Sequence, residues 1–257
     1  MDGDVVLCER DGPVALVTLN RPDKHNAVNR DMQAALAATI EALEADDDCL
    51  VIVLTGAGDK AFCAGADMGE VLERGALEPR PAGAPPPPPA PNGVGAVARA
   101  KKPVIGAING YAYGLGAQLS LSVDIRIASE NARWRFVGAS YGLVVSGADL
   151  PRIVGPAVAK ELLFTTRVVD ADEALRIGLA NRVVPAADLL PTSLEMARQI
   201  AANSPGAVRW AKRVVDAATT IEAGRAAEAE AGRALRGTSD NTTRFRAAAE
   251  RVIGGGA

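Results

Sequence analysis

The chain has 257 residues, of which 48% are hydrophobic and 23% charged, and its formal net charge is −3. Such a composition builds a sizeable core and excludes wholesale disorder, and the absence of long basic runs gives no sign of a nucleic-acid surface. Three cysteines and a single histidine fit neither a disulfide framework nor a structural zinc site. The N-terminus is acidic and lacks an apolar signal core. Together with the low cysteine count, this composition favours a protein of the reducing cytoplasm.

The first hundred residues predict a hairpin, a helix and a buried strand. Val5–Arg10 and Val14–Leu19 flank a glycine and proline turn and predict a β-hairpin. Asn29 is a plausible N-cap for a helix over Arg30–Ala45, whose apolar residues recur on one face. Leu50–Thr55 is almost continuously apolar, as expected for a strand buried on both sides.

Strands and helices then alternate, which indicates an α/β core. We expect a strand over Val104–Ile108, a helix over Leu115–Ser122 and a strand over Ile125–Ala128. The whole stretch from Pro103 to Val123 is uncharged and long enough to cross a membrane. Its glycines, prolines and polar residues instead favour a buried strand, a glycine turn and a buried helix, so we predict no membrane span.

Residues Gly75–Gly93 interrupt this pattern, because Pro85–Pro89 are five consecutive prolines with further prolines around them. Such a segment cannot pack as a helix. It is either a surface loop without a role or a mobile flap beside the site, and a proline-rich ligand for another protein is a third alternative.

The C-terminal part differs from the core, because no strand is predicted beyond about Ala186. We therefore divide the chain into an α/β core over residues 1–185, which includes the proline-rich loop 75–93, and a helical region over residues 186–257. Helical patterns rich in Ala, Glu and Arg cover Leu189–Asn203, Pro205–Ala218, Ile221–Arg236 and Asp240–Ile253.

Two turns rich in small residues carry the chemical signal of the chain. Phe62–Asp67 follows the strand Leu50–Thr55, Asn109–Gln118 follows the strand Val104–Ile108, and each turn precedes a helix. Two such junctions can direct two backbone N–H groups at one developing oxyanion. The pattern therefore favours the stabilisation of an enolate.

These motifs, in this order and spacing, resemble the enoyl-CoA hydratase/isomerase (crotonase) superfamily over nearly the whole chain. The similar segments are Leu19–Ala27, Leu54–Gly58, Phe62–Asp67, Lys102–Ile105, Asn109–Gly116, Asp124–Ala128, Gly178–Val184 and Glu250–Arg251. The resemblance implies a twisted α/β sheet core surrounded by helices, with a helical C-terminal region that builds homotrimers, often paired into hexamers.

The resemblance also implies the ligand and the residues that would hold it. The ligand would be an acyl thioester of coenzyme A, so that coenzyme A belongs to the substrate and no separate cofactor or metal is expected. The backbone N–H groups of Ala66 and Leu115 would hold the thioester oxygen. The residues expected on the coenzyme A and acyl sides are Lys24, His25, Ala27, Ala64, Asp67, Met68, Tyr141 and Arg251.

The chain departs from the family at its acids. The two glutamates of the hydratases would fall at Gln118 and Gly138, and neither residue exchanges a proton near neutral pH. Other members place an aspartate at the position of Ser146, and Asp149 follows three residues later. If a helix begins at Val145, Asp149 lies about one turn beyond Ser146 and is a candidate catalytic acid.

Several residues have a structural interpretation beside the functional one. His25 fits an exposed turn, Asp67 the N-terminus of its own helix, and Cys63 a small packed residue, since no histidine is placed to activate it. Trp134 and Tyr141 fit either core packing or an acyl pocket, and Glu70 or Glu73 could move a proton. We expect an enzyme of lipid metabolism acting on acyl-CoA; a catalytically silent acyl-CoA carrier or sensor, or a module that binds something else, are the alternatives.

Overall fold

The structure is a computed structural model that describes residues 4–73 and 91–218, together with 226–227, 229–231, 233–234, 238–240 and 243. Arg251, residues 74–90 of the proline-rich segment and most of the two helices predicted beyond Ala218 lie outside the described residues.

A six-stranded sheet forms the centre of the molecule, in the order β1-β2-β3-β5-β7-β10. Its first two strands pair antiparallel as the predicted hairpin, and the other neighbours are parallel. The strands are β1 (Val6–Asp11), β2 (Val14–Leu19), β3 (Val51–Gly56), β5 (Val104–Ile108), β7 (Ile125–Ser129) and β10 (Arg182–Val184).

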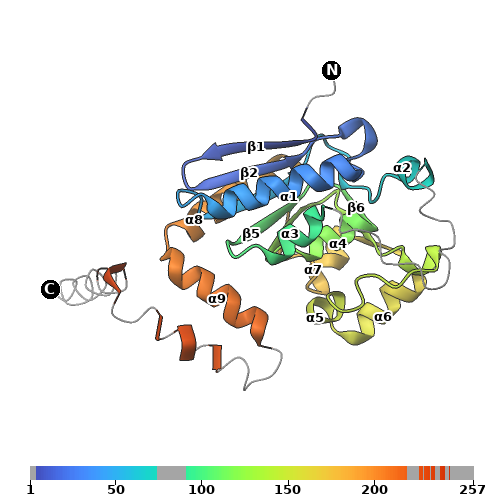
Figure 1. Ribbon diagram of the computed structural model, residues 1–257. Helices are drawn as coiled ribbons and strands as arrows, with labels where there is room; N and C mark the ends of the chain where they lie inside the picture. Colours follow the sequence, from blue (N-terminus) through green and yellow to red (C-terminus); the bar gives the residue numbers. More distant parts are fainter. Residues whose placement is uncertain are drawn as a thin grey trace, which may run out of the picture.

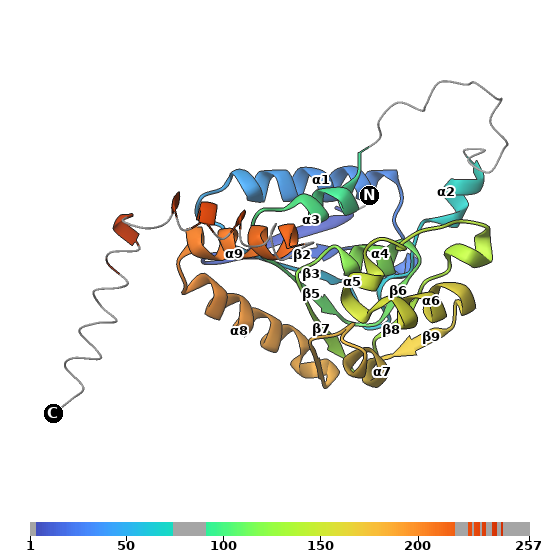
Figure 2. The ribbon, with the colours of Figure 1, turned by 90° about the horizontal axis from the view of Figure 1, so that it is seen from below.

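Helices cover both faces of this sheet. On one side lie α1 (Arg30–Ala45), α3 (Gly93–Arg99) and α4 (Leu115–Leu121), and on the other lies α8 (Leu189–Ala201) (Figures 1 and 2). Alternate residues of β3 serve the two cores: Ile52 and Leu54 pack toward α1, whereas Val51 and Val53 pack toward α8. The prediction of a strand buried on both faces is therefore confirmed.

A second, four-stranded sheet was not predicted from the sequence. It runs in the order β4-β6-β8-β9, with β4 (Ala61–Cys63), β6 (Tyr111–Tyr113), β8 (Arg133–Arg135) and β9 (Val168–Asp170). Each small-residue segment follows a long strand as predicted, β3 or β5, but its first part forms a further short strand, β4 or β6. Strands of three residues are too short to show a period of two in the sequence.

The predicted helix boundaries hold well where the structure describes them. Asn29 caps α1, since its Oδ1 accepts the backbone N–H of Met32 at 3.0 Å.

No helix of the described ranges is long and apolar enough to cross a membrane. The remaining helices are α2 (Met68–Glu73), α5 (Leu150–Val154), α6 (Pro156–Thr165), α7 (Ala171–Arg176) and α9 (Pro205–Ala217), with 3-10 turns η1 (Pro22–Lys24), η2 (Gly138–Tyr141) and η3 (Ala186–Asp188).

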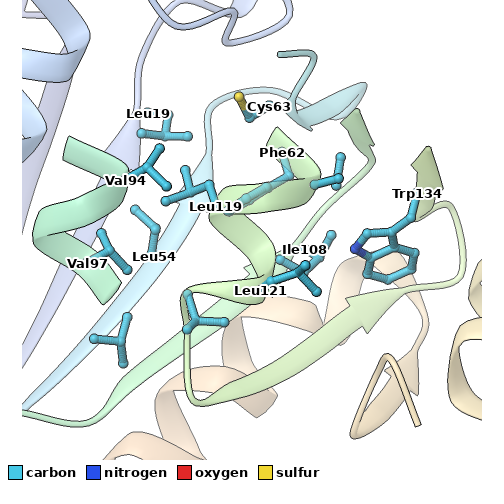
Figure 3. Packing of buried hydrophobic residues seen from close by; sticks show 14 of the residues in the cluster. Leu19, Leu54, Phe62, Cys63, Val94, Val97, Ile108, Leu119, Leu121 and Trp134 are labelled. Atoms are coloured by element: carbon cyan, nitrogen blue, oxygen red, sulfur yellow. The ribbon is translucent and has the colours of Figure 1, made fainter. Parts of the chain in front are cut away.

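The main core lies where the two sheets meet the inner face of α4. Leu119 of α4 packs among Leu54, Phe62 and Ile108, and the fully buried indole of Trp134 closes this cluster from β8 (Figure 3). The indole N–H donates to Ser120 Oγ at 3.1 Å, which satisfies the polar atom of the ring. The core interpretation of Trp134 is therefore confirmed, and α4 is fixed firmly at its inner side.

Candidate active site

The short sheet brings the two small-residue turns together. β4 and β6 are parallel neighbours, so the turns that follow their carboxyl ends lie at one edge of the sheet. A Cβ atom added to Gly65 would lie 3.0 Å from the carbonyl oxygen of Tyr113 and 3.7 Å from the backbone nitrogen of Leu115. The turn at Gly65 and Ala66 therefore faces the start of α4 directly.

Glycine is required at this contact for two physical reasons. Gly65 and Gly114 have φ angles of 117° and 51°, which side-chain-bearing residues rarely adopt. A Cβ atom on Gly116 would lie only 1.9 Å from the carbonyl oxygen of Cys63, so the first turn of α4 rests on the backbone of β4. These glycines keep the two turns within reach of one small ligand atom.

The backbone N–H of Ala66 is free to bind a ligand. Val28 forms a parallel bridge with this segment, in which its N–H donates to Gly65 O at 2.7 Å and its carbonyl accepts from Asp67 N–H at 2.9 Å. Because successive peptide groups of an extended chain point to opposite sides, the N–H of Ala66 points away from Val28. Within the described part of the chain it has no hydrogen-bond acceptor.

Leu115 provides the second free donor. It is the first residue of α4, where a backbone N–H has no partner inside the helix. No acceptor for it is found among the residues that the structure describes. The predicted pair of donors, Ala66 and Leu115, thus lies on facing turns, and neither N–H has a partner among the described residues.

The residues expected on the coenzyme A side lie around the same turn. The N–H of Ala64 donates to His25 O at 3.0 Å, and Arg21 Nη1 donates to Ala27 O at 2.7 Å. Lys24 and His25 are exposed, as predicted for His25, and His25 lies in the left-handed region with φ 51°. The turn therefore offers exposed side chains beside the Ala64 to Ala66 backbone.

Asn26 and Asn109 hold these turns in place, and the sequence analysis missed both roles. Asn26 is fully buried and donates to Ala57 O at 3.0 Å and Ala61 O at 2.8 Å. Asn109 donates to Gly56 O and Gly58 O, both at 2.9 Å. An asparagine within a turn is the signal that could have identified them, because its side-chain amide readily hydrogen-bonds nearby backbone groups.

Asp67 is engaged as the N-cap of α2. Its Oδ1 accepts the N–H groups of Gly69 and Glu70, and its Oδ2 accepts from Arg21 Nη1 at 2.9 Å. This hydrogen bond from Arg21 is the main reason that the pKa of Asp67 lies below its ordinary value. The helix-capping interpretation of Asp67 is confirmed, and Met68, the first residue of α2, is about half exposed.

The Arg21–Asp67 pair predicts an acid-dependent contribution to stability. The folded pKa of Asp67 is depressed, so the contribution is complete above the ordinary value of about 4 and is lost as the pH falls through the lower folded value. We expect Arg21→Met to cost roughly 1 kcal/mol at pH 7 and progressively less below pH 4. Urea unfolding from pH 7 to pH 3 measures this, with Arg10→Met of the exposed Arg10–Asp46 pair as control. A pH-independent cost would contradict it.

The other carboxylates that were candidates for proton transfer, Glu70, Glu73 and Asp149, are bound at a helix N-terminus or exposed to solvent. Glu70 Oε2 accepts the N–H of Arg30 at 2.8 Å, at the N-terminus of α1, and Glu73 is exposed. Asp149 is exposed at the N-cap of α5, and the condition for its catalytic role, a helix that begins at Val145, is not met, because α5 begins at Leu150. Pro151 explains the late start, since proline favours the first turn of a helix.

Asp149 lies on the wall of a separate cavity of about 730 Å³. This cavity is lined by the end of α4, the start of β7, α5 and α9, and none of its described lining residues is Ala66, Leu115 or Gln118. α9 is held across it by Lys212, whose Nζ lies 2.8 Å from Asp124 Oδ2. Asp149 is thus near the C-terminal end of α4, whereas the donor Leu115 is at the other end.

Gln118 belongs to the helix that begins at Leu115, and Gly138 follows a residue that borders the turn at Gly114. Gln118 is half-buried on α4, one turn after Leu115. Gly138 follows Val137, whose Cγ2 would lie 3.1 Å from a Cβ atom on Gly114. A Cβ atom on Gly138 would lie 2.9 Å from both Leu143 O and Val145 Cγ2. Leu143 and Val145 therefore occupy the space that a side chain at position 138 would need.

Tyr141 and Cys63 have contrasting environments. Tyr141 is exposed, at 59%, in the 3-10 turn η2. Cys63 is fully buried, and this burial raises the pKa of its thiol to about 12. It is packed, as predicted, rather than a nucleophile.

In the described ranges no group of histidine, cysteine and carboxylate side chains could hold a metal ion.

Comparisons with known proteins agree on one family. The family model for enoyl-CoA hydratase/isomerase matches residues 9–246. The chain is 40% identical to the short-chain-enoyl-CoA hydratase of Clostridium acetobutylicum over 84% of this chain and 82% of that protein. Its structure is similar to enoyl-CoA hydratase from Bacillus anthracis, with a TM-score of 0.84, 30% identity and 96% of both chains covered. It is also similar to a monofunctional enoyl-CoA isomerase from M. smegmatis, with a TM-score of 0.72 and 37% identity. That match covers 87% of this chain and 99% of the isomerase chain.

Proposed function

We propose, since the chain belongs to the enoyl-CoA hydratase/isomerase family, that it binds an acyl-CoA thioester with its carbonyl oxygen between the N–H groups of Ala66 and Leu115. Family membership confirms the predicted crotonase-like α/β fold and an enzyme of this class. The observation that carries the proposal is the pair of unpaired backbone donors on two facing turns. Donors so placed stabilise the negative charge of a thioester enolate.

The surroundings of the two donors fit the rest of such a ligand. The exposed side chains of Lys24 and His25 are positioned to contact the coenzyme A part beside Ala64. Met68 and Tyr141, both largely exposed, are available on the acyl side. Arg251, proposed to reach a coenzyme A phosphate, lies outside the described residues. A homotrimer or hexamer remains part of the proposal.

The proton chemistry is proposed to be enolate formation with slow hydration. Efficient hydration needs groups that pass protons to and from water, and these contribute roughly 10²–10⁴-fold. The amide of Gln118 can hold a water molecule but cannot exchange its own proton near neutral pH. Position 138 has no side chain, and Leu143 and Val145 fill the adjacent space. The α-proton would therefore pass to solvent while the two donors stabilise the enolate.

Mass spectrometry in D₂O tests this function with butyryl-CoA and crotonyl-CoA as probes. We expect deuterium at the α-carbon of butyryl-CoA well above the enzyme-free rate, and only slow addition of water to crotonyl-CoA. Asp149→Asn should leave both rates unchanged, because Asp149 lies at the far end of α4. Rapid hydration without exchange would overturn the enolate assignment. Binding of both thioesters without any change would instead support the acyl-CoA carrier.

A further inference from the structure

The cavity of about 730 Å³ beside α9, here called the α9 cavity, has no part in the proposed function. It lies between the end of α4, the start of β7, α5 and α9, and α9 runs from the α8 side of the sheet toward α5 (Figure 1). None of its described lining residues belongs to the two donor turns. Its volume is in the range of sites that bind small molecules.

A buried cation, Arg126 of β7, forms part of the wall of this cavity. The residue is 6% exposed, and burial lowers the pKa of its guanidinium while the charge of Asp124 opposes this. Arginine nevertheless stays protonated in proteins. Its Nε donates to Leu179 O at 2.7 Å and its Nη1 to Val123 O at 2.9 Å. Both N–H groups of Nη2 are left without an acceptor in the described part of the chain.

The unpaired Nη2 of Arg126 can be reached from the cavity. Among the described residues, Ser146 Oγ is the one fully buried side-chain polar atom that lacks a partner. The Nη2 atom of Arg126 is therefore accessible to solvent, and the α9 cavity is the space that Arg126 borders. A ligand in the cavity can thus accept two N–H groups from a positively charged side chain.

The other charged side chains on the wall limit the charge of such a ligand. Lys212 Nζ lies 2.8 Å from Asp124 Oδ2, so these two charges compensate each other. Arg152 is exposed, and its Nη2 donates to Asp216 O at 3.3 Å. Asp149 and Asp216 add two exposed carboxylates. Because these acids repel a ligand with several negative charges, the wall favours a monoanion at the unpaired guanidinium.

Much of the remaining wall is apolar, which favours a ligand with a hydrocarbon part. The larger apolar side chains that line the cavity are Leu121, Val123, Ile125, Ile153, Val208 and Val215. Val215 is 69% exposed, and no residue of α9 is fully buried. This apolar surface is in contact with water in the free protein, so covering it with a hydrocarbon chain is favourable.

We propose that the α9 cavity binds an organic monocarboxylate with an unbranched apolar chain, of the chemical class of a medium-chain fatty acid. The carboxylate accepts the N–H groups of Arg126 Nη2, and the chain displaces water from the apolar wall. This site is separate from the pair of donors at Ala66 and Leu115. A protein that failed to bind any thioester could still bind the carboxylate, so the inference does not rest on the proposed function.

Calorimetric titration of the full chain with octanoate tests this inference. We expect saturable binding, with an affinity that rises by up to about fourfold for each CH₂ group from butanoate to octanoate. Octan-1-ol, which has the chain but no charge, should bind roughly 10-fold more weakly or less. Saturating butyryl-CoA should leave octanoate binding unchanged, because the donor turns do not line the cavity.

Two variants and a matched control locate the binding. Arg126→Met should weaken octanoate binding roughly 10- to 100-fold. Because it also leaves the carbonyls of Leu179 and Val123 unpaired, a second variant keeps Arg126. Ala211→Phe, at an exposed position of α9 that lines the cavity, should block the chain and abolish saturable binding. Ala207→Phe is the control, because Ala207 is exposed on the same helix and is not among the described lining residues; it should bind as the wild type does.

Four results would overturn the inference. Octanoate could fail to bind the wild-type protein in a saturable way, whether another copy of the chain or only water fills the cavity. Displacement of octanoate by butyryl-CoA would place it at the thioester site instead. Equal affinities for octanoate and octan-1-ol would remove the role of Arg126. Equal effects of Ala211→Phe and Ala207→Phe would show that binding occurs outside the α9 cavity.

Discussion

Leu115→Pro is expected to lower the rate of α-proton exchange by about 10²–10³-fold, the usual effect of removing one oxyanion donor. Proline removes the backbone N–H that we assign to the thioester oxygen. The first position of a helix tolerates proline, because its N–H has no intrahelical partner and its φ already suits the ring. The loss should therefore appear in kcat for deuterium exchange into butyryl-CoA, with folding preserved.

Leu115→Ala is the matched control for this substitution. It removes the half-buried leucine side chain but retains the N–H, so we expect a much smaller loss of exchange rate. Circular dichroism and thermal unfolding should show both variants folded. Equal rates in the two variants would contradict a role for the N–H and would leave the side chain as the functional group at this position.

Trp134→Ala is expected to be the most destabilising single substitution considered, at roughly 3–5 kcal/mol. The indole is fully buried in the cluster around Leu119, between the short sheet and the helix that presents Leu115 (Figure 3). Its removal leaves a cavity in this cluster, and the neighbouring side chains can relax into it only in part. Chemical denaturation by urea measures the free energy of unfolding.

Trp134→Phe separates packing from hydrogen bonding. It keeps most of the ring contacts but loses the hydrogen bond to Ser120 Oγ, while the Ser120 hydroxyl still donates to Ala117 O at 2.7 Å. We therefore expect a smaller cost of about 1 kcal/mol, the net contribution of one hydrogen bond. A loss below 1 kcal/mol for the alanine variant would contradict the assigned packing. A phenylalanine variant as unstable as alanine would mean that the hydrogen bond, rather than ring volume, decides stability.

The sequence determined the elements whose signal is local and long enough to read. The apolar run at β3 and the one-faced pattern of α1 with its Asn29 cap follow from periodicity and side-chain chemistry, and the structure bears them out. The small residues around Ala66 and Leu115 indicated turns with accessible backbone N–H groups, because side chains there would block approach. That the hydratase glutamates would fall at Gln118 and Gly138 is implied by the resemblance and stays a prediction.

Only the tertiary structure decided how these pieces meet. The parallel pairing of β4 with β6, which sets Ala66 opposite Leu115, joins segments about 50 residues apart through strands too short to have a readable period. The carboxylates of Asp67 and Glu70 could have served chemistry, but the packing of α2 places them at helix N-termini. The cover that Leu143 and Val145 place over Gly138 follows from packing as well. Such contacts depend on the global arrangement of the chain, and no local pattern encodes them.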